Sequence, residues 1–340
     1  MLCDFWYVAA LAEDVDRGPI ERIVCNRPIV VFRGESGSLN ALQNFCSHRR
    51  APLSLGRVMG EAIECPYHGM RFAGDGTCTL IPCQSDIPSR ANVQSYPVVE
   101  RHGFVWVWPG DPTLADPATV PEMPWRDDPA WNSDTVYYYH VKGSHILMTD
   151  NLLDLGHVAF IHADTIGFAP EGLEEDPLVT EVQGDRIVNT RVFRDVQPSP
   201  AVKGWGNFKG TIERESVSTW SPPCFTSIYF ANRDATTQLE MRIDHLITPE
   251  TDTTHNYWVS VCRNFRIDDM ELDAQMLEDN DRVHQQDLEI VEAQQRMIDL
   301  VPDYQDMPIR QDKPLTIAHR VMARLEKQES DRRQERARAV

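Results

Sequence analysis

Two short segments, each with a cysteine followed closely by a histidine, constrain this chain more than any other feature. They read Cys46-x-His48 and, after sixteen intervening residues, Cys65-x-x-His68. Together they place two thiolates and two imidazoles in two matching loops. This ligand set can hold a metal centre in which one metal is bound only by sulfur and the other only by nitrogen.

Two kinds of metal centre use two cysteines and two histidines. A Rieske [2Fe-2S] cluster has two histidines in place of two cysteines on one iron, which raises its reduction potential. Zinc forms tetrahedral structural sites with the same residues. Zinc fingers usually pair the cysteines on a hairpin and the histidines on a helix, but here each half-motif supplies one of each. Turn residues also surround both segments, and they are Pro52, Pro66, Gly69, Gly74 and Gly76. The pattern favours a Rieske cluster held by Cys46, His48, Cys65 and His68, with zinc as the alternative.

Composition narrows the cellular setting and the partners. The 340 residues suit two domains, and the net charge of −19 argues against nucleic acid or anionic membranes as partners. No apolar run reaches the roughly 18 residues that cross a membrane, and the N-terminus lacks the basic leader of a signal peptide. Six cysteines remain outside the two segments without a disulfide-like spacing. We therefore expect a cytoplasmic protein with reduced thiols.

The chain divides into a β-rich part and a mixed part. Up to Trp108, short β-branched and aromatic runs are separated by turn residues, as in residues 29–32 and 39–45 around Gly34-Glu35-Ser36-Gly37. A segment rich in proline and aspartate follows from Pro109 to Asp128, as is typical of a linker. We expect a small all-β domain over residues 1–110 and a second domain over residues 111–340.

The second domain is expected to be α+β, with an antiparallel sheet and segregated helices. Its predicted helices cover residues 145–162 and 268–300, and the charged tail from residue 318 to 340 is expected to be helical too. Its predicted strands are residues 136–141, 187–193, 217–220, 225–231, 239–247 and 255–262.

A second candidate metal site lies in the first of these helices. His157 and His162, with one distant carboxylate, would complete the facial triad of non-haem Fe(II) oxygenases. Residues five apart on an ideal helix point about 140° apart around its axis, so both histidines can face one iron only across a wide turn or a helix end. We predict a π-bulge here, because such bulges are frequent at functional sites.

Asp154 strengthens this interpretation, because two histidines on an apolar helix could otherwise be ordinary core residues. It lies one turn before His157 and could accept the second ring N–H of that histidine, which would fix its tautomer. The third ligand must come from elsewhere, and the long helix offers many acids. Asp287 shares a face with Val283, Ile290 and Val291, so it should point into the core, where a carboxylate needs a metal or a partner. Glu278, Asp281 and Glu289 lie off this face, so we predict Asp287 as the ligand.

At this point the chain resembles the Rieske non-haem iron oxygenases, in particular the oxygenase components of the vanillate O-demethylase, dicamba monooxygenase and toluenesulfonate methyl-monooxygenase group. The resemblance covers essentially the whole chain. Besides the two metal motifs it rests on residues 6–10, 95–101, 105–111, 150–157, 247–251 and 263–265. Arg50 is a local departure, because relatives often have glycine there.

The resemblance implies a Rieske domain followed by a helix-grip catalytic domain. It implies ring-shaped homotrimers that take electrons from NADH through a separate flavin and iron-sulfur reductase. In such a ring the cluster of one subunit serves the iron of its neighbour, and Asp154 would bridge His68 of one chain to His157 of the next. His245 resembles a pocket position that could hydrogen-bond a carboxylate or phenol, and Asn151 is a second candidate for substrate binding.

The expected function is oxidation of a methoxy or methyl group of a small aromatic acid by O2, with O-demethylation and release of formaldehyde favoured. The iron performs the chemistry, and the protein excludes water and positions a C–H bond. Ring dihydroxylation is an alternative within enzymes. A Rieske electron-transfer protein is an alternative of another class, although the region beyond residue 110 argues against it.

Overall fold

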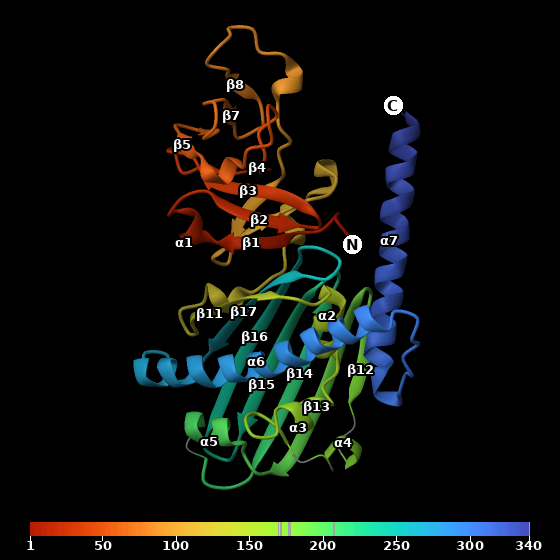
Figure 1. The fold of residues 1–340 in the computed structure, drawn as a ribbon. Helices are drawn as coiled ribbons and strands as arrows, with labels where there is room; N and C mark the ends of the chain where they lie inside the picture. The colour runs from red at the N-terminus through yellow and green to blue at the C-terminus, as the bar shows by residue number, and fades with distance from the viewer. Residues whose placement is uncertain (169, 171, 176–177, 207, 340) are drawn as a thin grey trace. The chain divides into compact units, whose positions relative to one another are not determined.

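The computed structural model describes residues 1–168, 170, 172–175, 178–206 and 208–339. The chain forms two compact units (Figure 1). The first comprises residues 1–122 with 248–251, and the second comprises residues 123–247 with 252–340. The proline-rich segment expected as a linker contains three short 3-10 turns at Pro112–Leu114, Pro117–Thr119 and Pro124–Arg126. The domain boundary that we expect near residue 110 stays a prediction.

The first unit is built from three small antiparallel sheets. The predicted hairpin is present, since β3 (Arg27–Arg33) pairs with β4 (Leu39–Gln43) in a register that sets Val31 opposite Ala41. The three sheets run β1-β10-β9, β2-β3-β4 and β5-β6-β7-β8. The remaining strands are β1 (Tyr7–Leu11), β2 (Ile20–Val24), β5 (Arg57–Met59), β6 (Ala62–Glu64), β7 (Arg71–Ala73), β8 (Cys78–Leu80), β9 (Val98–Arg101) and β10 (Phe104–Val107), and α1 spans Ala12–Val15.

A compact apolar core lies beneath the two cysteine-histidine segments. Phe32, Leu42 and Phe72 from three strands are fully buried in it. Cys46 and Cys65 belong to the same cluster of buried residues. The hydrophobic effect therefore fixes the base of both loops, while their tips remain at the surface of the unit.

The second unit is a seven-stranded antiparallel sheet with helices, as the sequence predicts. Its strand order is β11-β17-β16-β15-β14-β13-β12. The strands are β11 (Asn132–Val141), β12 (Val179–Gln183), β13 (Arg186–Val196), β14 (Ile212–Ser221), β15 (Phe225–Arg233), β16 (Gln238–Pro249) and β17 (His255–Arg263). Each predicted strand lies within one of these, and β12 is an additional strand. The fold class is confirmed.

Long helices accompany this sheet. Figure 1 shows α6 (Met270–Leu300) running across the strands, and the hydroxyl of Tyr137 on β11 donates to the carbonyl of Leu277 on α6 at 2.9 Å. The helix begins where the carboxylate of Asp269 accepts the N–H of Leu272, an N-cap that agrees with the predicted start near residue 268. The other helices are α2 (His145–Leu153), α3 (Val158–Ile161), α4 (Gly172–Glu175), α5 (Pro200–Gly206) and α7 (Lys313–Ala339). Among the described residues, no helix has the length and apolar character needed to cross a membrane.

Candidate metal centres

The two cysteine-histidine loops have the same backbone hydrogen bonds. In the first loop the N–H of Cys46 donates to the carbonyl of Ala51, and the N–H of Arg50 donates back to the carbonyl of Cys46. In the second loop Cys65, Met70 and Gly69 repeat this arrangement in the corresponding positions. Arg50 and Gly69 both have positive φ, at 57° and 71°. Both turns therefore use the left-handed conformation that glycine adopts at least cost.

The loops separate the thiols from the imidazoles. The side chains of Cys46 and Cys65 are 2% exposed, whereas His48 and His68 are exposed with ring centroids 4.7 Å apart. Burial, together with the neighbouring Cys65 thiol, raises the pKa of Cys46 to about 11. The donor set thus has a buried sulfur end and an exposed nitrogen end, which fits a cluster with unlike iron atoms.

Gly69 allows a sharp test of the second loop. Alanine at position 69 would have to adopt φ near 71°, and its Cβ would lie 3.3 Å from Cγ of Pro82. Left-handed backbone costs an L-residue about 1–2 kcal/mol. We expect Gly69→Ala to lower both the melting temperature and the iron and sulfide content of the purified protein.

Gly60→Ala is the matched control for this variant. Gly60 also has positive φ, at 63°, but no atom would lie within 4 Å of its new Cβ. It should lower the melting temperature by a similar amount and keep the cluster. Equal cluster content in the two variants would contradict a special role for the Gly69 turn.

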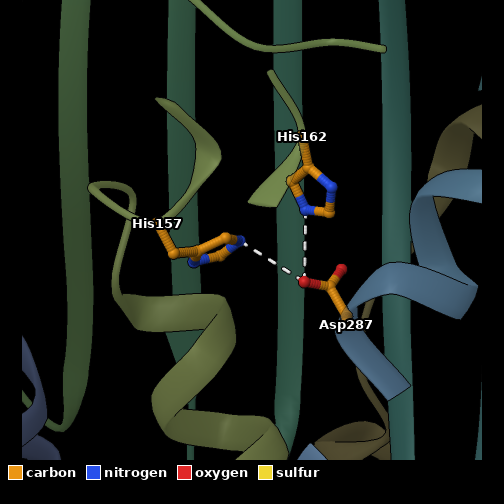
Figure 2. A group of neighbouring side chains, drawn as sticks. All are labelled: His157, His162 and Asp287. Atoms are coloured by element: carbon orange, nitrogen blue, oxygen red, sulfur yellow. Dashed lines mark ion pairs between the residues drawn. The ribbon is translucent and has the colours of Figure 1, made fainter. Parts of the chain in front are cut away.

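The structure brings His157, His162 and Asp287 together, as predicted. Figure 2 shows one carboxylate oxygen of Asp287 facing both imidazoles, with Oδ1 3.5 Å from Nε2 of His157 and 3.1 Å from Nε2 of His162. The three potential ligand atoms lie within 4.8 Å of one another. Two imidazoles and one carboxylate on one side of a cation leave its other positions open. The donor set fits a mononuclear non-haem iron.

A helix end, rather than a π-bulge, brings the two histidines to one side. The π-bulge prediction is wrong, because α2 ends at Leu153 and Asp154 has extended backbone. The carboxylate of Asp154 accepts the N–H of Gly156 at 2.8 Å, which closes a turn before α3 begins. His157 and His162 then flank the single short helix α3 (Val158–Ile161). The predicted helix over residues 145–162 is therefore two helices.

Asp287 lies on the buried face of α6 with Val283 and Val291, while Ile290 is exposed instead of sharing this face. Burial disfavours the charged carboxylate, but hydrogen bonding and charge from the histidines hold the pKa of Asp287 below its usual range. Burial also lowers the pKa of His157. The carboxylate is therefore ionised and its oxygens are available to a cation.

Hydrogen bonds from neighbouring side chains orient two of the three predicted metal ligands. Nδ1 of His162 lies 2.9 Å from Oε1 of Gln286, so this nitrogen can donate to the amide and leave Nε2 for a metal. Nδ2 of Asn151 donates to Oδ1 of Asp287 at 3.0 Å. The sequence does not distinguish Gln286 from the other polar residues of the helix, except that it precedes Asp287.

Asp154 does not make the bond to His157 that the sequence suggests. Its Oδ1 is engaged by Gly156, and Nδ1 of His157 is buried without a partner among the described residues. The extended backbone at Asp154 replaces the helical turn that the prediction assumes, although the charge of this carboxylate still opposes the lowering of the pKa of His157 by burial.

The triad opens into a cavity lined mainly by apolar side chains. Asn151 and His245, the two candidates for substrate binding, both line it, and so do His157, His162 and Asp287. Nδ1 of His245 lies 2.5 Å from the hydroxyl of Tyr257, and burial lowers the pKa of His245 to about 3. His245 is therefore neutral. Its Nε2 has no partner among the described residues.

An all-β domain with paired cysteine-histidine loops, followed by a helix-covered sheet with a 2-His-1-carboxylate site, defines a Rieske non-haem iron oxygenase. Comparison with known proteins places the chain within this class. Residues 5–97 match the Rieske [2Fe-2S] domain, and residues 141–328 match the vanillate O-demethylase oxygenase C-terminal domain. The chain belongs to the vanillate O-demethylase group of Rieske oxygenases. It contains a Rieske cluster and a mononuclear iron site at His157, His162 and Asp287, and both cofactor predictions are confirmed.

Full-length relatives support this membership. The putative toluene-4-sulfonate monooxygenase iron-sulfur subunit of Comamonas testosteroni is 34% identical over 96% of this chain and 97% of its own length. The vanillate O-demethylase oxygenase subunit of a Pseudomonas species is 33% identical, over 94% and 93%. The crystal structure of dicamba monooxygenase bound to 3,6-dichlorosalicylic acid has a TM-score of 0.91 and 30% identity, covering 97% of this chain and 99% of that one.

Proposed function

We propose that this chain is the terminal oxygenase of a multicomponent system that oxidises a methoxy or methyl group of a small aromatic acid. O-demethylation is the favoured reaction. The observation that carries the proposal is the His157, His162 and Asp287 triad opening into a mostly apolar cavity, which suits the body of an arene. The names of the similar proteins, which include two O-demethylases and a toluene-4-sulfonate monooxygenase, support the same class of substrate.

The residues of the cavity have separable tasks. The iron, when bound, supplies the activation of O2. The apolar lining excludes water and holds the ring, so that one C–H bond points at the triad. If the Tyr257 hydroxyl donates to Nδ1 of His245, the Nε2–H of His245 faces the cavity as a donor for an oxygen of the substrate. Asn151 steadies the Asp287 carboxylate and is the second candidate for a polar contact.

The cluster, when bound by Cys46, His48, Cys65 and His68, supplies electrons one at a time, and NADH provides them through a separate reductase. We also propose that the protein works as a homotrimer in the cytoplasm. Asp154 would then bridge His68 of one subunit to His157 of the next. Two features support this role, because Nδ1 of His157 lacks a partner among the described residues and His68 is exposed on its own unit. The six cysteines outside the cluster loops are free thiols, which is compatible with a reducing compartment.

Formaldehyde release tests the proposed reaction. With a reductase of the vanillate demethylase type, NADH and O2, we expect a methoxyarene acid to yield one phenol and one formaldehyde per NADH and O2 consumed. Oxidation of the methoxy carbon gives a hemiacetal, which collapses to these two products. A methylarene acid should yield the benzylic alcohol.

Other products would decide for the alternatives. A cis-dihydrodiol from the ring would favour the dihydroxylase interpretation. NADH oxidation without any oxygenated product across a panel of methoxy- and methylarenes would contradict the proposed function and favour an electron-transfer protein.

A further inference from the structure

A buried arginine lines the same cavity as the iron ligands. Strand β14 alternates buried and half-buried residues, and its buried set includes Arg214, Ser216 and Ser218 between Ile212 and Trp220. Arg214 is 7% exposed and lines the cavity with His162 and Asp287. A charged side chain at an inward position of a strand needs a compensating partner.

Nothing in the described part of the chain neutralises this guanidinium. Its Nη1 donates to the carbonyl of Ile166 at 2.8 Å, and its Cζ lies 5.5 Å from the centre of the Phe230 ring. Its Nε is buried without a partner, and no ion pair joins it to a carboxylate of the described residues. Burial lowers the pKa of Arg214 to about 10, so the group is still charged at neutral pH.

Asn232 adds a second polar group at the same place. It lies opposite Arg214 in the β14-β15 register, it is buried, and it also lines the cavity. Its Oδ1 has no hydrogen-bond partner among the described residues. Rotating the amide by 180° exchanges its oxygen and nitrogen, so Asn232 can present a donor here.

The pair lies away from His245. Along β15, Asn232 faces Arg214 on one neighbouring strand, while Thr226, six residues earlier, faces His245 on the other. The ring of His245 lies 6.4 Å from that of His284, which is about one helical turn before Asp287 on α6. Ile228 and Phe230 line the cavity between the two ends. Arg214 and His245 therefore lie at opposite ends of the cavity.

We propose that Arg214 and Asn232 form the subsite that binds the carboxylate or sulfonate of the substrate, at the end of the cavity remote from His245. This inference rests on the proposed function and names the group that recognises its substrates. An oxyanion on the ring supplies the missing partner of the guanidinium, and both oxyanions fit its planar donors. Substrates with the acid and the methyl or methoxy carbon at opposite ends of the ring should bind best.

Calorimetric titration of the holoenzyme, without reductase so that no turnover occurs, tests the subsite. The ligands are 4-methylbenzenesulfonate, 4-methoxybenzoate, 2-methoxybenzoate and the uncharged 4-methylanisole. We expect Arg214→Gln to weaken both 4-substituted anions about 10- to 100-fold, as the loss of a charged hydrogen bond predicts, and to change 4-methylanisole much less. Arg214→Lys should be intermediate.

Arg191→Gln is the matched control. Arg191 is also buried and lies on the adjacent strand β13, but its side chain is not among those lining this cavity. It should leave the preference for anions unchanged. Circular dichroism melting and the cluster spectrum verify that each variant is folded. If Arg214→Gln does not fold, Asn232→Ala tests the subsite independently.

The outcomes separate the subsite from the proposed function. Equal weakening of charged and uncharged ligands, or tighter binding of 2-methoxybenzoate than of 4-methoxybenzoate, would overturn the subsite even if methyl oxidation is observed. Anion binding that depends on Arg214 would uphold it even if no methyl or methoxy group is oxidised. The relative affinities of the sulfonate and the carboxylate then identify which acid the site prefers.

Discussion

Replacement of Asp287 by alanine is expected to reduce oxygenation of every methyl- and methoxyarene below detection while the Rieske cluster keeps its visible and EPR spectra. The variant loses the carboxylate that faces both His157 and His162, and two imidazoles alone hold Fe(II) weakly. Iron analysis should show loss of the mononuclear iron only. Formaldehyde release and NADH consumption measure the activity.

Glu289→Ala provides the control for this experiment. Glu289 lies on the same helix two residues further on, and its side chain is exposed. Its removal should leave iron content and turnover unchanged. Oxygenation by the Asp287→Ala enzyme would contradict the assignment of Asp287 as the third ligand.

Asp154→Asn is expected to lower turnover by about 10- to 100-fold without loss of either metal, the usual effect of removing a residue that orients a metal ligand. The substitution keeps the size of the side chain and its ability to accept the N–H of Gly156, so the turn should survive. It removes the charge that the proposed bridge between subunits requires. Two measurements report the effect. One is steady-state formaldehyde release, and the other is the rate at which a chemically reduced cluster is reoxidised in the presence of substrate and O2.

Asp150→Asn is the matched control, because Asp150 lies on α2 close in sequence but pairs with His319 at 2.8 Å. Its reoxidation rate should remain that of the unmodified protein. If the Asp154→Asn enzyme reoxidises its cluster just as fast, Asp154 acts only in the local turn.

The sequence predicted the iron site better than its local backbone. Helical periodicity selected Asp287 because its burial follows from its neighbours Val283 and Val291, although Ile290 of the same argument is exposed. The spacing of His157 and His162 showed that a regular helix was impossible. The spacing does not distinguish a π-bulge from a helix end. The helix ends here because the side chain of Asp154 accepts the N–H of Gly156 and closes a turn.

The polar face of β14 shows where strand prediction fails. Strands are recognised by apolar residues at alternate positions, but the buried positions of β14 include Arg214, Ser216 and Ser218. The prediction therefore began only at residue 217, and Arg214 was missed. Arg214 can be buried here because it lines a cavity, and several strands and α6 together form that cavity. No pattern within one short segment of sequence predicts such a cavity.

The matching turns at Cys46 and Cys65 have a consequence for how the cluster is lost. Each loop offers one sulfur and one nitrogen, so each contributes one ligand to each end of an asymmetric two-metal unit. Opening either turn would leave both iron atoms with half of their protein ligands. Damage to one loop is therefore shared equally by the two metals, and assembly and decay of the cluster should be all-or-none, with no long-lived single-iron species.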